Sequence, residues 1–292
     1  MWKAAGEVKW INPVFPSGDT EDFPVAKLKI AICPIRPTTP TTPLQNQGKW
    51  DSNILPPLAN PTEVNGFVTA KRLEEHLAGR HLLSQMLIKW GVDDLSLVEV
   101  KRDENRAPSL SWIEGTFRRQ PLPNISIGHS GEWAIVALID SEWFVGIDAE
   151  PSRREISPSA FPMMAKGDEL DKLNASPNSA VLRWTVKEAI QKCMRLGMNL
   201  NPRDIVTHIE SSIGSFEAKF LIGKSIIQLT SWREHGQQIS LAIRAYSPPP
   251  KSSLDLLLEQ TAKEMNNQIV INKDGNKEYT FGVGCSTTRH CQ

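Results

Sequence analysis

The eight residues Trp143-Phe144-Val145-Gly146-Ile147-Asp148-Ala149-Glu150 join an apolar, strand-forming run to two acidic residues. The pattern predicts a strand over Trp143–Asp148. Because side chains alternate between the two faces of a strand, residues i and i+2 share a face. Asp148 and Glu150 therefore project together from a stretch that otherwise belongs to the core. The alternative is that the two acids mark only a turn after an edge strand.

The clearest helix is predicted over residues 180–196, with Gly197 ending it. At 100° per residue, Glu188 and Lys192 share one stripe with Thr185, Arg195 and Trp184, opposite the apolar face. An indole beside a carboxylate and a lysine indicates a packing or recognition role at a cleft. The alternative is an ordinary surface ion pair between neighbouring helical turns.

Asp148, Glu150 and Glu188 form, with Lys192, a set of groups suited to phosphate chemistry. Hard divalent cations prefer oxygen ligands, and a lysine beside them can contact a phosphate. The sequence therefore predicts a cation held by three carboxylates against a phosphate group.

The remaining pattern predicts an α+β fold. A second helix is expected over residues 68–90, ending at Gly91, and a short one around 161–173. Strands are expected near 26–33 and over 95–100, 125–127, 133–139, 204–209, 215–221, 225–232 and 238–245. Residues 103–120 are expected to form a polar loop. We expect an N-terminal lobe over 1–150 with a Pro/Thr-rich loop at 34–62, a C-terminal lobe over 151–246, and a tail over 247–292 with an amphipathic stretch at 254–265.

The composition narrows the class of protein. The 292 residues carry 33 Lys+Arg and 33 Asp+Glu, so a net charge of zero gives no argument for nucleic acid as a partner. The four cysteines form no CxxC pair, which favours a reduced, cytoplasmic chain over a disulfide scaffold. We expect no signal peptide and no membrane span. Cys285, His290 and Cys291 could hold a metal, but a plain tail is the favoured interpretation.

Four motifs occur in a defined order. They are the basic segment Lys71–Arg80, then Gly128-His129-Ser130, then Gly146–Glu150, then the segment Trp184–Lys192, which reads WTVKEAIQK. In this order they resemble the 4′-phosphopantetheinyl transferases of the Sfp/EntD type (group II). Those proteins show a Ser-His block, a GIDxE block and a W-x-x-KE-x-x-x-K block, and the EntD-like branch adds a basic helix that contains AGR. Arg106 and Pro108 fall where the family carries a short Pro-containing motif, and the resemblance covers residues 66–210.

The resemblance implies a fold of two pseudo-symmetric lobes, each a long helix on a small, mainly antiparallel sheet. It implies an enzyme, a holo-[acyl-carrier-protein] synthase. This enzyme would transfer 4′-phosphopantetheine from coenzyme A to a serine of an acyl, peptidyl or polyketide carrier protein and release adenosine 3′,5′-bisphosphate. Mg²⁺ would be the cofactor, and the enzyme would be a monomer serving fatty acid, polyketide or siderophore biosynthesis.

The resemblance also assigns roles to individual residues. Asp148, Glu150 and Glu188 would bind the metal, and Glu188, Lys192 and His129 would be catalytic. Coenzyme A would contact a larger set: Lys71, Arg80, His129, Ser130, Lys187 and Lys192. Gly128 departs from the family, which usually has Ser there, so Ser126 or Ser130 would have to supply the hydroxyl.

Two other functions remain open on the sequence. The same carboxylates could serve a metal-dependent phosphohydrolase or nucleotidyl transferase. A binding module that kept the fold and lost turnover would also be compatible with Gly128 and with the unmatched tail.

Overall fold

The chain divides into two compact units, Met1–Tyr246 and Ser247–Gln292. The structure is a computed structural model that describes residues 5–12, 27–35, 55–115, 120–207, 209, 216–222, 225–246, 269–271 and 277–279. In the second unit, β11 (Ile269–Ile271) and β12 (Lys277–Tyr279) form an antiparallel pair. The amphipathic stretch predicted at 254–265 lies outside the described residues, as do the three tail residues considered for a metal site.

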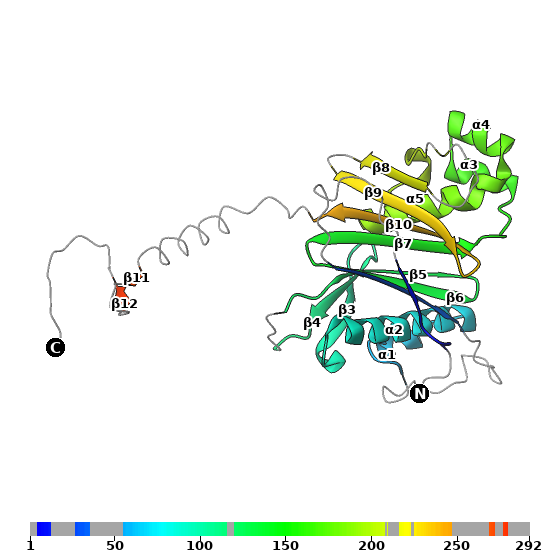
Figure 1. Ribbon diagram of the computed structural model, residues 1–292. Coiled ribbons are helices and arrows are strands. Elements are labelled where there is room, and N and C mark those ends of the chain that lie inside the picture. The colour runs from blue at the N-terminus through cyan, green and yellow to red at the C-terminus, as the bar shows by residue number, and fades with distance from the viewer. Residues whose placement is uncertain are drawn as a thin grey trace, which may run out of the picture. The chain divides into compact units, whose positions relative to one another are not determined.

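The described part of the first unit is built around two four-stranded antiparallel sheets and two long helices, with a smaller two-stranded sheet beside them (Figure 1). One sheet has the order β1 (Lys9–Ile11), β2 (Leu28–Pro34), β6 (Trp133–Ile139), β5 (Asn124–Ser130). The other has the order β7 (Trp143–Pro151), β10 (Gln237–Ala245), β9 (Ser225–Glu234), β8 (Phe216–Ile222). The mixture of helix and antiparallel sheet confirms the predicted α+β class, whereas pseudo-symmetry between two lobes stays a prediction.

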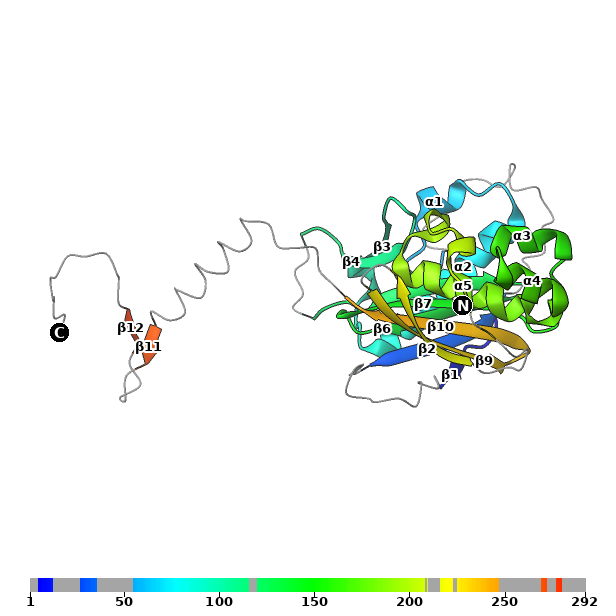
Figure 2. The same ribbon diagram turned by 90° about the horizontal axis from the view of Figure 1, so that it is seen from above.

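Helix α2 (Ala70–Trp90) packs on the first sheet, and α5 (Ala180–Met194) packs on the second. Side chains of α2 form one core cluster with the face of β2 and β6 that carries Ala31 and Val136. The opposite face, with Ile30 and Ile135, packs against the second sheet. Leucine and isoleucine side chains of α5 then cover the far face of the second sheet. The layers therefore run helix, sheet, sheet, helix, and Figure 2 shows α5 lying across β7 and β10.

Strand β7 places its residues on two different cores, as alternation requires. Val145 and Ile147 pack between the sheets, whereas Phe144 lies against the α5 cluster. Gly146, on the α5 side, allows a very close approach: a Cβ there would lie 1.9 Å from the carbonyl oxygen of Ala189. The glycine thus lets the helix backbone rest on the strand, which brings Asp148 near α5.

Several predicted boundaries were correct and others were wrong. Helix α2 ends at Trp90 with Gly91 in the left-handed conformation, as predicted. Helix α5 ends at Met194 instead of 196, because Arg195 and not Gly197 takes the left-handed cap. The expected helix at 161–173 is two helices, α3 (Phe161–Met164) and α4 (Asp168–Ala175), separated at Gly167.

Three further segments differ from the prediction. The strand expected at 95–100 is a turn of 3-10 helix followed by β3 (Val98–Arg102). The expected polar loop contains β4 (Pro108–Trp112), which pairs with β3 as a hairpin. Short helix α1 (Pro61–Asn65) begins inside the expected Pro/Thr-rich loop.

The strand expected at 204–209 is absent from the described part of that segment, which begins with a 3-10 turn at Pro202–Asp204. Its backbone carbonyl groups accept hydrogen bonds from two buried basic side chains instead of from a neighbouring strand. Pro202 and Ile205 accept from Lys187, and Thr207 and Ile209 accept from Arg183. Among the described helices, none has the length and apolar character that crossing a bilayer requires.

Candidate active site

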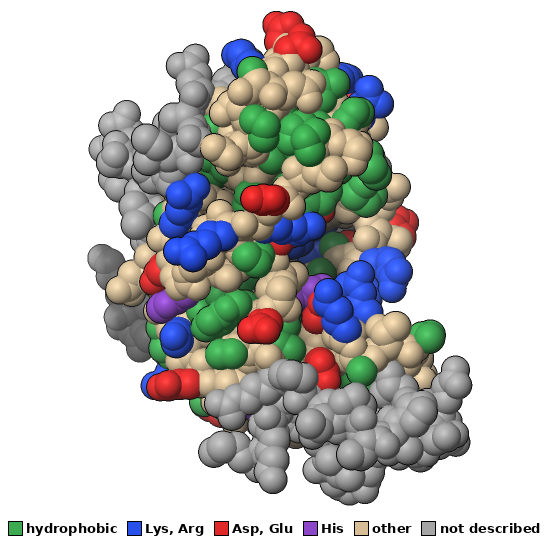
Figure 3. Space-filling model, turned by 90° about the vertical axis from the view of Figure 1, so that its right-hand side faces the viewer, with side chains coloured by type: hydrophobic (Ala, Val, Ile, Leu, Met, Phe, Trp, Pro, Cys, Tyr) green, Lys and Arg blue, Asp and Glu red, His purple; other side chains and the backbone are tan. Residues whose placement is uncertain are grey.

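A cavity of about 580 Å³ lies where α2, the β3–β4 hairpin, β5 and α5 meet. Its lining includes one acidic side chain, Glu75, against six lysine or arginine side chains: Arg72, Arg80, Arg102, Arg106, Lys192 and Arg195. Figure 3 shows basic side chains gathered around a recess on this face of the molecule. Such an excess of positive charge in a concave site attracts an anionic ligand.

Lys192 joins this cavity to the acidic end of β7. Its Nζ lies 2.6 Å from Oδ1 of Asp148, while the lysine side chain keeps 27% of its surface exposed. Burial, with a smaller contribution from the nearby carboxylates of Glu188 and Glu150, raises the pKa of Asp148 to about 7 against the opposing effect of Lys192. The second carboxylate oxygen, Oδ2, is buried without a hydrogen-bond partner among the described residues.

The other two predicted metal ligands lie close enough to act electrostatically on Asp148. Glu188 is half-buried on α5, one turn before Lys192. Glu150 accepts a hydrogen bond from Ser130 and forms an ion pair with Arg154. In the described portion of the chain, no three His, Cys, Asp or Glu side chains already stand as a metal cluster. The unpartnered Oδ2 nevertheless fits a cation, because a buried carboxylate oxygen is costly without a partner.

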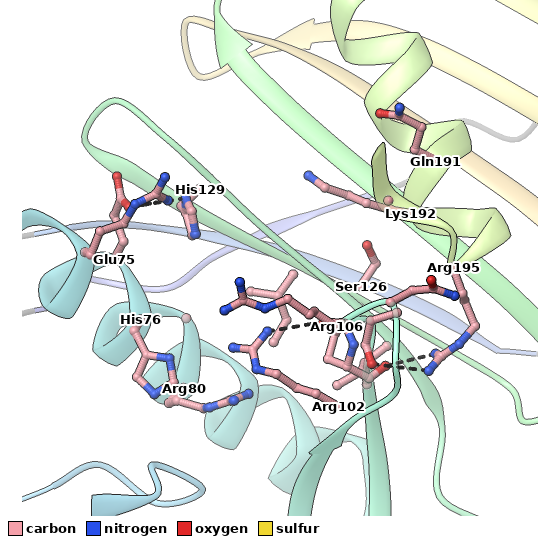
Figure 4. Close-up of a pocket in the computed structure, with 18 of the residues that line it drawn as sticks. Glu75, His76, Arg80, Arg102, Arg106, Ser126, His129, Gln191, Lys192 and Arg195 are labelled. Atoms are coloured by element: carbon pink, nitrogen blue, oxygen red, sulfur yellow. Dashed lines mark hydrogen bonds and ion pairs between the residues drawn. The ribbon is translucent and has the colours of Figure 1, made fainter. Parts of the chain in front are cut away.

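His129 lies on β5 beside Glu75, with 3.6 Å between Nδ1 and the carboxylate (Figure 4). Burial lowers the pKa of His129; Lys192 and Arg72 lower it further against the opposing Glu75. The imidazole is therefore neutral at physiological pH, and it can offer a ligand one N–H group but no full charge.

Arg80 reaches the cavity from α2 and is almost fully buried. Its Nη2 contacts Glu63 of α1 at 3.3 Å, and the same carboxylate accepts from Arg102 at 2.7 Å. Glu63 itself does not line the cavity. Nε of Arg80 is buried without a hydrogen-bond partner among the described residues, whereas Nε2 of His76 lies 3.8 Å from the Glu63 carboxylate. This end of the cavity therefore presents a guanidinium donor that a bound anion could satisfy.

Three residues predicted to contact the cofactor lie elsewhere. Lys187 is fully buried and donates to Glu169 at 2.7 Å, to Pro202 O at 2.9 Å and to Ile205 O at 2.6 Å. All three of its ammonium hydrogens are thus used, which gives it a structural position, and its contact with coenzyme A stays a prediction. Ser130 donates to Glu150 and does not line the cavity. Lys71 is 76% exposed and also lies outside the lining, where Arg72 takes its place.

Lys187→Met is expected to lower the free energy of unfolding by about 3 kcal/mol, because two buried carbonyls and a buried carboxylate lose their donor. Urea denaturation measures this change. The exposed Lys172 of α4 gives the control, and Lys172→Met should change the value by less than about 0.5 kcal/mol. An unchanged unfolding midpoint for Lys187→Met would contradict the structural role.

Gly128 has little space for a side chain. A Cβ at residue 128 would lie 3.1 Å from Cγ2 of Ile135, 3.3 Å from the carbonyl oxygen of Ile147 and 3.3 Å from Nζ of Lys192. A serine there would require small shifts of these neighbours. Ser126, two residues earlier on β5, lines the cavity and accepts a hydrogen bond from Ile147 N at 3.0 Å.

The sequence interpretation missed several cavity residues, chiefly Arg102, His76 and the supporting Glu63. Arg102 and Glu63 belong to no motif with a recognisable spacing, and the hairpin that carries Arg102 was expected to be partly loop. His76 sits within the basic segment that was noted, and its helical spacing from Arg80 was the available signal.

Comparison with known proteins gives one match and one negative result. No curated protein matches the chain. Residues 144–244, which hold β7, α5 and β8 to β10, match the family model of the 4′-phosphopantetheinyl transferase superfamily. The resemblance to these transferases is therefore confirmed at the level of the superfamily for this part of the chain.

Proposed function

We propose that this protein is an Sfp/EntD-type transferase that moves 4′-phosphopantetheine from coenzyme A to a serine of a carrier protein. The observation that carries the proposal is Lys192, which lines a cationic cavity and contacts the carboxylate of Asp148. Coenzyme A carries a pyrophosphate and a 3′-phosphate, and these anions suit a cavity with six basic side chains and one acidic side chain.

The residues divide the work of the reaction between them. Arg80 and His129 would hold phosphate oxygens, and Lys192 would contact the pyrophosphate as a point charge. The serine oxygen of the carrier would bond to the phosphorus bearing the pantetheine arm, and the bond from that phosphorus to the bridging oxygen would break. Glu188 would accept the serine proton. Adenosine 3′,5′-bisphosphate would leave with the bridging oxygen.

Asp148, Glu150 and Glu188 would hold Mg²⁺, and the unpartnered Oδ2 of Asp148 supports that role. When bound, the ion supplies charge stabilisation for the phosphate that leaves. Lys192 must then share Asp148 with the metal, which the two separate carboxylate oxygens permit.

The test is mass spectrometry of an apo carrier protein incubated with this protein, coenzyme A and Mg²⁺. We expect the carrier to gain one phosphopantetheine, and we expect no gain with EDTA or with a carrier whose acceptor serine is alanine. Carriers from fatty acid, polyketide and siderophore synthases should be compared. No gain with any carrier, together with phosphate release from nucleotides, would favour a phosphohydrolase instead.

The raised pKa of Asp148 predicts a pH-dependent response to Mg²⁺. The folded-state pKa of about 7 exceeds the ordinary 3.8, so the folded protein holds this proton more tightly than the unfolded chain. The stability that the proton contributes is lost as pH rises through about 7, where the carboxylate becomes a metal ligand. Melting curves should therefore show a larger stabilisation by Mg²⁺ at pH 8 than at pH 6. Asp148→Asn should abolish the difference, and equal stabilisation at both pH values would contradict the assignment.

A further inference from the structure

The side chain of Arg195 fastens the turn between β3 and β4 to the end of α5. Arg195 donates from Nη1 to Pro108 O at 2.9 Å, and from Nη2 to Ala107 O at 3.3 Å and to Asp103 Oδ2 at 2.9 Å. One guanidinium thus spans three acceptors of the hairpin, a geometry that lysine cannot reproduce. Figure 4 shows Arg195 reaching from α5 to this turn.

The turn delivers cavity residues. Asn105, Arg106 and Ala107 all line the cavity, as does Arg102 just before them. Nη1 of Arg102 donates to Arg106 O at 3.3 Å, so the turn also braces this arginine. A change in the position of the turn would therefore move two guanidinium groups of the cationic wall together.

Asp103 organises the turn through hydrogen bonds to its backbone. Its Oδ1 accepts from the backbone N–H groups of Asn105 at 3.0 Å and Ala107 at 2.8 Å, which leaves Oδ2 for Arg195. Asp103 does not line the cavity. A second link lies alongside, where Asn199 Nδ2 donates to Asn105 Oδ1 at 2.7 Å.

Both arginines at this junction hold an unfavourable backbone conformation. Arg195 has φ of 60° at the helix cap, and Arg106 has φ of 65° in the turn. Glycine is preferred in such left-handed positions, because a Cβ is disfavoured there. An arginine at a position where glycine fits better indicates that its side chain has a function.

We propose that Arg195 and Asp103 form a clasp that positions the β3–β4 turn, and with it Arg102 and Arg106, on the anionic part of coenzyme A. The clasp ties these ligand contacts to α5, the helix that carries Glu188 and Lys192. Arg195 and Asp103 are positioning residues for the bound substrate. The inference rests on the proposed function, since coenzyme A is the ligand.

The affinity of the Asp103→Asn variant for coenzyme A distinguishes a positioning role of Asp103 from a simple effect of its charge. The asparagine keeps the Oδ1 acceptor of the turn, but its amide nitrogen cannot accept from Arg195. The substitution also removes a negative charge near a site for anions, so charge alone predicts tighter binding. The clasp predicts that coenzyme A binds about tenfold more weakly. Glu99→Gln is the matched control, because it makes the same charge change in β3, where Glu99 contacts only Lys101 and Ser111 among the described interactions.

Arg195→Gly separates positioning from stability. Glycine relieves the backbone at the cap while the three hydrogen bonds are lost, so we expect a melting temperature close to that of wild type together with about tenfold weaker binding, to which the loss of one of the six basic cavity side chains also contributes. A residue of merely structural importance would lower the melting temperature and leave the affinity unchanged.

The experiment is isothermal titration of coenzyme A into the full chain and the three variants, with melting curves for each. Weaker binding by Asp103→Asn and Arg195→Gly, with Glu99→Gln within about twofold of wild type, supports the clasp. Equal or tighter binding by Asp103→Asn while wild type binds normally overturns the clasp alone. A wild-type protein that binds no coenzyme A overturns the proposed function and the clasp with it.

Discussion

Lys192→Met is expected to lower kcat/KM for transfer from coenzyme A by about 10²- to 10³-fold, the loss typical of removing one charged group that stabilises a transition state. The side chain lines the cavity and lies 2.6 Å from Asp148, so it can contact a phosphate beside the proposed metal ligands. Methionine has a similar length but carries no charge. Single-turnover assays by mass spectrometry of the carrier would measure the effect.

Lys192→Met has a second consequence, because it leaves Asp148 buried without its partner. The pKa of Asp148, already about 7, should rise further, and the variant should be less stable at pH 8 than at pH 6. Activity should therefore be compared at a temperature where melting curves show both proteins folded. Lys89→Met, at an exposed position near the end of α2, is the control and should keep full activity. A folded Lys192→Met protein with activity within threefold of wild type would remove Lys192 from the proposed mechanism.

Gly146→Ala is expected to lower the free energy of unfolding by at least about 4 kcal/mol, above the usual cost of overpacking. The new Cβ would lie 1.9 Å from Ala189 O and 2.4 Å from Cys193 N. Both atoms belong to the backbone of α5, so no side-chain rotation can relieve the clash. The helix would have to move away from β7, which also separates Lys192 from Asp148.

The matched control for this substitution is Gly79→Ala in α2. There the new Cβ would lie 3.2 Å from a side-chain methyl group of Ile127, which can shift, and alanine has the higher helix propensity. Chemical denaturation of both variants would give the comparison, with little change expected for Gly79→Ala. Equal stability of Gly146→Ala and wild type would show that α5 does not need its close contact with β7.

The hydrophobic periodicity of the sequence was sufficient to predict most of the helices and strands. Helices α2 and α5 and strands β6, β7, β9 and β10 follow directly from apolar patterns, because the helices bury a regular face and the strands are apolar runs buried between two layers. Strand β4 was missed, since its half-buried residues do not alternate clearly. The strand predicted after Pro202 was wrong for a different reason. The carbonyl groups of this segment accept hydrogen bonds from Lys187 and Arg183, which no local pattern can indicate.

In the candidate site, too, some relations follow from the sequence and others only from the tertiary structure. The sequence alone determined that Asp148 and Glu150 share one face of a strand and that Glu188 and Lys192 share one stripe of a helix, because these relations follow from local backbone geometry. Only the tertiary structure decided that Lys192 meets Asp148 and that Lys187 is buried against Glu169. It also decided that the arginines of a distant hairpin complete the cavity. Such contacts depend on how α5 packs on β7 and on where the β3–β4 turn lies, and residues far apart along the chain set both positions.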